Sequence, residues 1–512
     1  MLRTAITPAS LAGRGCRILR ILWRKQWVED FRYVALGGAL LSSAQEQVMS
    51  LTNQGVCWHA IERRAFLRWL GWGGGTACLA ACGASSTPAG KGQKVIVTFW
   101  TPGGGGDFCT GLDAIARDFE PHHPNIALAA TQCGTGEQEF NEVLLARIAA
   151  GNPPDATLLW TSPAALAARG ALLPLDALMQ QARYAQAENW PPAVLASCRF
   201  AGQTYGLPVT AGSCGMWYNP EMFEHKGIPT SREDFPKSWD ELRRLSQEFT
   251  VWKGDRLEVA GFMPWHAVED LPIWSALNGS QLYDAAHRKY TIDAEPNVAM
   301  MEYAVDWLNQ EYQGDFAKVM RSGNWEGYET EGRQPAFIDQ RQAMFLTYSW
   351  NMGLKIFTHS AFPWNLARLP VGPGGTKTVA GYWPNWLALP RGSRHVEQAF
   401  AWLDYMSGVG VQAWFRNFPD LPANLQVPRD LLPTALVDGK GKTFAQDIMH
   451  FFRAQLDSAT PMWDSPVQDF ATDQIRRALE QIMHKVTTPR NALVEAQKAC
   501  QGALDKVLQA GA

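Results

Sequence analysis

From residue 94 onward, apolar residues follow two patterns in turn, one typical of β-strands and one typical of α-helices. Residues 94–100 form a continuous β-branched and aromatic run, which is typical of a strand buried on both faces of a parallel sheet. Helical spacing follows at residues 112–119, and residues 125–130 predict a second strand. The same order returns in a helix expected at residues 140–148 and a strand at residues 156–160. Alternating strands and helices predict an α/β fold, in which ligands meet the loops after the carboxyl ends of the strands.

A capping box marks the start of a later helix. Ser238 and Glu241 have the spacing at which each side chain bonds a backbone N–H of the first turn, and an apolar face follows over residues 242–249. Further helical patterns are expected at residues 298–308, 396–406, 470–482 and 492–508.

A paired arginine and a short apolar run precede this body. Arg63 and Arg64 stand before residues 69–81, a segment shorter than the ~20 residues that cross a bilayer, and small residues then lead to Cys82. This pattern predicts an export signal over residues 49–81 with a lipid attached to Cys82. The alternative is a buried helix that ends in cysteine, which three consecutive glycines in the segment disfavour.

The remaining amino-terminal residues are interpreted around that signal. Residues 79–82 form the lipid-attachment box, and Met49 is the expected start of translation. Residues 1–48 are then an over-long extension, with a separate targeting arm as the alternative. Residues 82–92 are small and polar, which suits a flexible tether. We therefore expect an exported protein that is anchored through its lipid to a membrane of the cell envelope.

The signal resembles the twin-arginine signals of bacterial lipoproteins. Those signals place Ser or Thr before the paired arginines and Phe-Leu-Lys after them, whereas this chain has Glu62 first and Arg68 last. A general secretion signal needs only the positive charge and the apolar run. Both export routes therefore stay open.

Length, charge and cysteine spacing narrow the class of protein. The chain beyond Cys82 is longer than one hydrophobic core usually covers, so two lobes are expected. A formal net charge of −3 provides no basic field for nucleic acid. Among the cysteines after Cys82, C-x-x-C spacing is absent. Because an exported chain permits disulfides, the candidate bridges are Cys109 with Cys133 and Cys198 with Cys214.

A series of short segments resembles the extracellular solute-binding proteins of carbohydrate ABC importers, a family that includes the maltose and glycerol-3-phosphate binding proteins. Each segment alone is common, but the series covers nearly all of the chain after the signal in the family's order. The segments are residues 124–126 (PNI), 140–150, 151–155 (GNPPD), 160–163 (WTSP), 170–175 (GALLPL), 206–210 (GLPVT), 217–223 (WYNPEMF), 237–242 (KSWDEL), 342–344 (QAM) and 381–390 (GYWPNWLALP).

The resemblance implies a periplasmic-binding-protein-like fold, with two α/β lobes, crossing hinge strands and a ligand cleft between the lobes. The first lobe would comprise residues 93–210 plus 348–406, and the second residues 211–347 plus 407–512. The implied crossings lie near residues 210–215, 344–350 and 406–410. Four glycines near these crossings would absorb the backbone changes of a hinge: Gly212, Gly215, Gly408 and Gly410. By resemblance, a closed pair of lobes would deliver ligand to ABC permease subunits.

The loops around the implied cleft favour a neutral ligand. They contain no Lys, Arg or His, whereas a buried anion normally requires such groups. They are rich in tryptophan, which offers an apolar face to a sugar ring and an N–H to a hydroxyl. Trp350 also matches a family position whose ring stacks on sugar. The expected ligand-binding residues are Trp100, Thr101, Asp107, Glu137, Trp160, Ser162, Thr210, Ser213, Trp265, Trp325, Trp350, Tyr382 and Trp383.

Two other functions stay open. Asp107, Glu137 and Glu139 beside tryptophans would suit a polyamine or another cation. Paired carboxylates of a polysaccharide-degrading enzyme are not visible as a sequence pattern, although the H-E-x-x-H and G-x-S-x-G motifs are absent. We expect a binding protein without catalytic residues, metal or cofactor, which captures a neutral sugar or oligosaccharide by hinge closure.

Overall fold

The computed structural model describes residues 94–103, 106–134, 137–264, 267–328, 330, 332–418, 420–456, 459–461 and 465–510. All of them belong to one compact unit, Pro88–Ala512. The predicted extension, the export signal with Arg63 and Arg64, the lipid site at Cys82 and the tether therefore lie outside the described residues. No described helix is long and apolar enough to cross a membrane.

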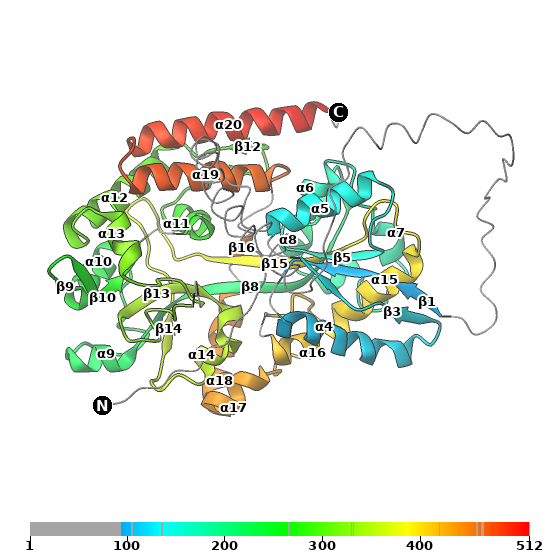
Figure 1. The fold of residues 1–512 in the computed structure, drawn as a ribbon, viewed down its shortest axis with the longest axis horizontal. Helices are drawn as coiled ribbons and strands as arrows, with labels where there is room; N and C mark the ends of the chain where they lie inside the picture. The colour runs from blue at the N-terminus through cyan, green and yellow to red at the C-terminus, as the bar shows by residue number, and fades with distance from the viewer. Residues whose placement is uncertain are drawn as a thin grey trace, which may run out of the picture. The chain divides into compact units, whose positions relative to one another are not determined.

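The first part of the unit is built from parallel strands and intervening helices, as the apolar pattern predicts (Figure 1). Strand β1 pairs with β3, and β2 lies between β4 and β5, all in parallel. The elements are β1 (Val95–Val97), β2 (Phe99–Thr101), α4 (Gly106–Phe119), β3 (Ile126–Leu128), β4 (Gln132–Cys133), α5 (Glu137–Ala149) and β5 (Ala156–Leu159). The α/β class is confirmed.

The first predicted strand is divided at Thr98. The Thr98 backbone N–H and hydroxyl both donate to Oδ2 of Asp155, at 2.9 and 2.8 Å. The Asp155 N–H also bonds the Thr98 hydroxyl oxygen at 2.9 Å. These bonds end β1 and begin β2, so residues 94–100 supply strands to two sheets.

The five helices expected farther along the chain are confirmed. Ser238 accepts the N–H of Glu241 at 3.3 Å while the Glu241 carboxylate accepts the Ser238 N–H, which is the predicted capping box. The helices are α10 (Trp239–Phe249), α12 (Glu295–Glu311), α15 (Val396–Tyr405), α19 (Gln468–Met483) and α20 (Pro489–Ala510).

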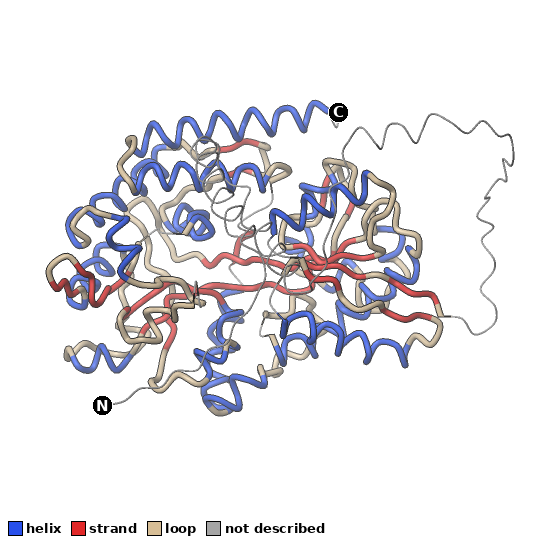
Figure 2. Tube along the Cα trace, viewed as in Figure 1, coloured by secondary structure: helices blue, strands red, loops and turns tan. Residues whose placement is uncertain are grey.

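One ten-stranded sheet runs through the described unit, in the order β4-β2-β5-β15-β8-β13-β10-β9, with β14 beside β8 and β16 beside β15. Figure 2 shows strands β8 and β15 in the middle of the unit, with helices on either side. Strand β8 (Leu207–Tyr218) is buried along all 12 residues, and β15 (Ala380–Ala388) pairs with it antiparallel. The remaining strands are β6 (Arg199–Phe200), β7 (Gln203–Thr204), β9 (Val251–Lys253), β10 (Arg256–Phe262), β11 (Tyr283–Asp284), β12 (Lys289–Tyr290), β13 (Gln342–Tyr348), β14 (Asn365–Ala367) and β16 (Ala459–Pro461).

The other described helices connect these strands. They are η2 (Glu120–His122), α6 (Pro163–Ala167), α7 (Asp176–Met179), η3 (Ala187–Asn189), α8 (Pro192–Ala196), α9 (Pro220–His225), η4 (Val268–Asp270), α11 (Leu271–Leu277), α13 (Phe316–Ser322), η5 (Ser349–Gly353), α14 (Lys355–Thr358), η6 (Met406–Gly410), α16 (Val411–Asn417), α17 (Thr434–Lys440) and α18 (Lys442–Leu456).

The buried side chains form separate cores along the sheet. The first core joins β2, α4 and α15 to the start of β8, for example through Phe99, Trp402 and Val209. The second core joins the end of β8 to α10, α12, α19 and α20. A third core packs Trp217 of β8 against residues 352–366 and α18. These cores do not test the predicted lobe boundaries, which stay a prediction.

The four glycines expected at the hinge all lie against neighbouring side chains. A Cβ on Gly212 would lie 2.6 Å from the ring of Trp350, and one on Gly408 would lie 2.3 Å from the ring of Tyr184. Gly215 and Gly410 likewise face Phe451 at 3.0 Å and Met406 at 2.6 Å. A larger residue would displace an aromatic ring at Gly212 and Gly408, so packing alone accounts for glycine at these two positions, and the hinge role of the four glycines stays a prediction.

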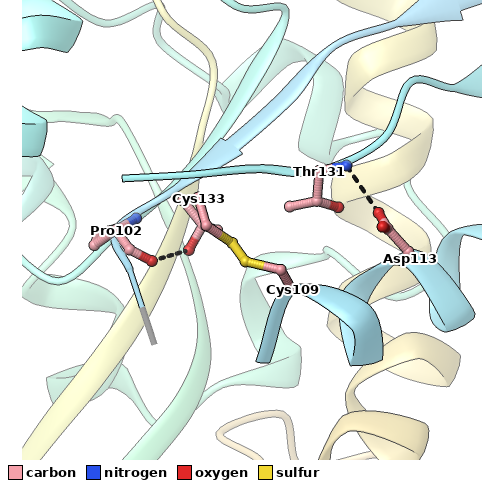
Figure 3. The surroundings of a disulfide bond; sticks show 6 residues. Pro102, Cys109, Asp113, Thr131 and Cys133 are labelled. Atoms are coloured by element: carbon pink, nitrogen blue, oxygen red, sulfur yellow. Dashed lines mark hydrogen bonds between the residues drawn. A yellow bond between two sulfur atoms is a disulfide. The ribbon is translucent and has the colours of Figure 1, made fainter. Parts of the chain in front are cut away.

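A disulfide joins Cys109 of α4 to Cys133 of β4 (Figure 3), as expected. The Thr131 N–H donates to the Asp113 carboxylate at 2.8 Å and ties the same two segments together. The other predicted bridge is wrong.

Cys198 and Cys214 are both free and buried. Strand β8 extends by ~3.3 Å per residue and carries Cys214 into the second core, whereas Cys198 packs with Trp386 beside β5. Burial raises the pKa of the Cys214 thiol to about 12, so the thiol is protonated and unreactive at neutral pH.

Candidate ligand-binding site

Three aromatic side chains meet where β13 ends and β15 crosses the sheet. The rings of Tyr348 and Trp350 stack with centroids 4.3 Å apart and planes 6° apart. Trp383 meets them edge-on, at 4.7 Å from Tyr348 and 6.4 Å from Trp350. The short helix η5 turns the chain immediately after β13, and Gly212 leaves room for the Trp350 ring against the backbone of β8.

The register of β8 and β15 sets which predicted residues share a face of the sheet. Trp383 pairs with Gly212 and Asn385 with Thr210, and side chains two residues apart on a strand point the same way. Thr210 and Trp383 therefore lie on the face that carries Trp350. Tyr382 and Ser213, which pair with each other, lie on the opposite face.

Tyr382 and Ser213 are used by the fold. Tyr382 is buried in the first core. The Ser213 hydroxyl donates to the carbonyl of Gly381 at 3.3 Å, and its N–H donates to the hydroxyl oxygen of Ser349 at 3.1 Å. These contacts fix β8 against β15 and η5 behind the aromatic group.

Sequence reasoning missed an acidic residue beside this group. Asn385 Nδ2 donates to Thr210 Oγ1 at 2.7 Å and to Asp420 Oδ2 at 2.8 Å. The other carboxylate oxygen, Oδ1, lies 3.3 Å from the position that a Cβ on Gly212 would occupy, on the same glycine that the Trp350 ring covers. Burial raises the pKa of Asp420 to about 7. An acidic residue within an otherwise apolar stretch was the only signal in the sequence.

Two buried polar atoms of this site have no hydrogen-bond partner among the described residues: Nε1 of Trp383 and Oδ1 of Asp420. An indole N–H is a donor, and a carboxylate oxygen is an acceptor. Buried polar groups normally have partners, because an unsatisfied one costs free energy. The site therefore offers one donor and one acceptor beside an aromatic face.

Tyr348 connects the site to η4. Its hydroxyl donates to the Asp270 carboxylate, and burial together with that negative charge holds the pKa of Tyr348 well above its usual value. Tyr348 is therefore neutral and held in place. Its ring stacks on the Trp350 ring.

Four other predicted residues border the carboxyl ends of β2 and β5. Trp100 and Trp160 are partly exposed, and the guanidinium of Arg147 lies 5.5 Å from the Trp100 ring centroid. The hydroxyls of Thr101 and Ser162 are buried and already bonded, to the carbonyls of Pro102 at 3.1 Å and Ser197 at 3.2 Å. The two rings can therefore meet a ligand, whereas the two hydroxyls serve the fold.

The last four predictions differ in what the structure describes. Trp325 is 1% exposed in the second core, and its N–H donates to the Val319 carbonyl at 3.0 Å. The structure thus places Trp325 in the protein interior. Asp107 and Glu137 lie in α4 and α5, but their side chains, and all of Trp265, are outside the described residues.

Helix α19 contacts the β5 loop through Asp469. The Asp469 carboxylate accepts the Thr161 hydroxyl at 3.0 Å and the Asn141 amide at 3.4 Å, and Asn141 also donates to Thr161 at 2.6 Å. Burial raises the pKa of Asp469. This cluster ties the carboxyl-terminal helices to the amino-terminal strands.

Two surface hollows of about 530 and 680 Å³ lie elsewhere, beside α12 and beside α20. None of the predicted ligand residues lines either of them. Within the described ranges, no group of three or more His, Cys, Asp or Glu side chains could hold a metal ion.

The family model for the bacterial extracellular solute-binding proteins matches residues 110–413, which is more than half of the chain. The chain belongs to this family. Members of an extracellular family are exported, which agrees with the sequence expectation.

Two curated relatives show how much of the chain is shared. An uncharacterized ABC transporter extracellular-binding protein of Pyrococcus horikoshii is 22% identical over 68% of this chain and 77% of its own length. The multiple sugar-binding protein of Streptococcus mutans is 21% identical over 64% of this chain and 75% of its own length.

Solved structures show the same fold. CpMnBP1 with mannotriose bound has a TM-score of 0.66 at 19% identity, covering 79% of this chain and all of its own. A Listeria monocytogenes ABC substrate-binding protein in complex with cycloalternan has a TM-score of 0.65 at 18% identity, covering 81% and 100%. The predicted two-lobed, periplasmic-binding-protein-like fold is confirmed.

Proposed function

We propose that this protein captures a neutral oligosaccharide between its lobes and delivers it to the permease of an ABC importer. The observation that carries the proposal is the group of Tyr348, Trp350 and Trp383, beside an indole N–H and a carboxylate oxygen that have no partner among the described residues. A sugar ring has an apolar C–H face for such aromatic rings and hydroxyls for both polar atoms.

The relatives support the same ligand class. One is a multiple sugar-binding protein, and several proteins of the same fold hold mannotriose, mannobiose, maltose or cycloalternan. On the face that carries Trp350, the described strand residues Thr210, Asn385 and Trp383 carry no positive charge, which disfavours an anionic ligand.

Capture would proceed by lobe closure. Ligand that contacts both lobes only in the closed state shifts the population toward that state. The Asp469 cluster would be one of the contacts made on closure, because it joins α19 to Asn141 and Thr161. Small-angle scattering at saturating ligand should show a fall in radius of gyration, and identical curves would argue for a preformed closed pocket.

A thermal-shift screen tests the ligand class. Mannotriose, mannobiose, maltose and maltotriose are tested against spermidine, and a ligand at 100 times its Kd adds about 2.7 kcal/mol to the stability of the native state. Stabilisation by a saccharide that is recovered intact supports the proposal. Stabilisation by spermidine alone would replace the sugar with a cation, and release of reducing ends would indicate an enzyme.

We further propose that the exported protein is held at the membrane by a lipid on Cys82. The support is the sequence around residues 79–82 and membership in an extracellular family. Mass spectrometry of the native amino-terminal peptide tests this. An unmodified peptide that spans Ala81 and Cys82 in the membrane fraction would contradict it.

A further inference from the structure

We propose that Asp420 is a ligand-binding residue that accepts a hydrogen bond from a sugar hydroxyl through Oδ1, while Trp350 holds the apolar face of the same ring. This inference rests on the proposed function and names the polar group that would determine which hydroxyl is recognised.

The first argument is hydrogen-bond accounting around the carboxylate. Oδ2 accepts the Asn385 amide at 2.8 Å, and Asn385 is itself fixed by Thr210 at 2.7 Å. Oδ1 has no partner in the described part of the chain. Water has little access to it, because the residue is only 8% exposed. A carboxylate left half-bonded in a protein interior is destabilising, so a fold that needed only structure would have little use for it.

The second argument is the position of Oδ1. Trp350 and Asp420 both lie close to Gly212: a Cβ added to Gly212 would be 2.6 Å from the Trp350 ring and 3.3 Å from Oδ1 of Asp420. The unpaired oxygen therefore lies near the Trp350 ring. A ring that packs on Trp350 would bring its edge hydroxyls toward Asp420, since the hydroxyls of a sugar project from the edge of its apolar face.

The third argument is how rigidly the carboxylate is held. Residues 421–423 are bonded along β8, through the Ala211 N–H to the Leu421 carbonyl at 2.7 Å and the Ala423 N–H to the Val209 carbonyl at 3.2 Å. Asn385 on β15 holds the side chain from the other strand. An acceptor fixed in this way by the crossing strands needs little reorganisation to bind a ligand.

The substitution Asp420→Asn in the full chain is the direct test. Its side-chain oxygen can still accept the Asn385 bond, so the atom facing the site changes from an acceptor to an NH₂ donor without a change in size. We expect a tenfold or greater loss of affinity for the saccharide that stabilises the wild-type protein best. Asp155→Asn is the matched control, because Asp155 is a buried carboxylate whose two oxygens are both bonded within the protein. That control should retain wild-type affinity.

A pH series on the wild-type protein provides a second readout that needs no variant. The carboxylate accepts a hydroxyl hydrogen most strongly when ionised, so affinity should fall as the pH is lowered from 8 to 5. Among the described residues, Asp420 bonds Asn385 from β15 and lies next to Gly212 from β8, and neither of these ionises in that range. Asp420→Asn should remove this pH dependence. An unfolded variant would leave the wild-type series as the deciding measurement.

The outcomes separate the two proposals. Equal affinity of the wild-type protein and Asp420→Asn at every pH would overturn the role of Asp420 while leaving sugar binding intact. A wild-type protein that none of mannotriose, mannobiose, maltose and maltotriose stabilises would overturn sugar binding, and the role of Asp420 with it. If Asp420→Asn lost only the binding of spermidine, sugar binding and the sugar-binding role of Asp420 would likewise be overturned.

Discussion

Asp155 and Asp420 are two buried carboxylates beside the same sheet with opposite surroundings. Oδ2 of Asp155 accepts the N–H and hydroxyl of Thr98, and Oδ1 accepts the N–H of Arg394 and the ring of His395, each at 3.2 Å. Although burial alone would raise the pKa of Asp155, the Thr98 bonds and His395 hold it below its usual value. Asp420 has one described side-chain partner and a raised pKa.

This difference in hydrogen bonding distinguishes a carboxylate that stabilises the fold from one that is available to a ligand. The satisfied carboxylate divides β1 from β2 and holds the loop before α15, so its bonds stabilise the lobe in every state. The half-satisfied carboxylate lies beside aromatic rings that the protein leaves partly exposed. A buried carboxylate with a perturbed pKa and an unpaired oxygen beside aromatic rings is a candidate for a functional site.

The largest expected effect concerns Trp325, a tryptophan of the interior. Trp325→Ala should lower the free energy of unfolding by about 3–5 kcal/mol, because it opens a cavity in the second core and removes a buried hydrogen bond. Saccharide affinity of the folded fraction should be unchanged. Chemical denaturation and calorimetry measure the two quantities, and a loss of affinity without a loss of stability would move Trp325 to the site.

Next in size is the loss of the satisfied carboxylate. Asp155→Asn should cost about 3 kcal/mol of unfolding free energy near neutral pH, because it removes a charge that is bonded on both oxygens. The folded pKa of Asp155 is depressed, so its contribution is present above the unfolded pKa and is lost as the pH falls through the folded pKa. The variant and the wild-type protein should therefore converge in strong acid. A constant gap down to low pH would show that packing, and not charge, carries the effect.

Trp350→Ala is the corresponding test for a tryptophan of the candidate site. Removal of a central binding surface often costs 2 kcal/mol or more of binding free energy, so we expect at least a tenfold loss of affinity. The ligand-free melting temperature should move by only a few degrees, because Trp350 is partly exposed. Titration calorimetry and thermal melts test this. A large drop in melting temperature with affinity retained would return Trp350 to the core.

The smallest expected effect is a change in how stability depends on pH. The folded pKa of Asp420 is raised to about 7, so the stability it contributes is fully present below the unfolded pKa and is lost as the pH rises through the folded pKa. Relative to the wild-type protein, Asp420→Asn should become more stable by roughly 2 kcal/mol between pH 5 and pH 8. Denaturant melts of the ligand-free proteins measure it.

A variant that gains stability while it loses affinity is expected of a site that trades one for the other. If Asp420→Asn were instead destabilised at pH 8, Asp420 would resemble Asp155. The contrast between the two carboxylates would then fail.

The elements were predictable where the signal is local. Helical spacing and the Ser238 capping box depend on neighbours three or four residues away, so α4, α10, α12, α19 and α20 could be expected from the sequence. The break at Thr98 could not, because it depends on a carboxylate 57 residues away. The pair of Cys198 and Cys214 failed for the same reason, since the extension of β8 separates residues that are close in the sequence.

The site was predictable only in its composition. A tryptophan in a loop has the same sequence signal whether it lines a site, like Trp350, or packs inside, like Trp325. Which of Thr210 and Ser213 faces the aromatic group depends on the register between β8 and β15. Asp420 gave almost no signal, because its burial results from side chains that distant strands supply.

The second core has a consequence for the order of events during synthesis. Its residues begin with Cys214 and Met216 on β8 and end with Cys500 and Leu504 on α20. Such sequence-distant contacts slow folding, because the intervening chain must be ordered before they form. A ribosome that has not yet released α19 and α20 therefore holds a chain whose second core is open, long after any amino-terminal signal has emerged. That interval is available to factors that recognise unfolded chains, and it closes only when the last two helices join the core.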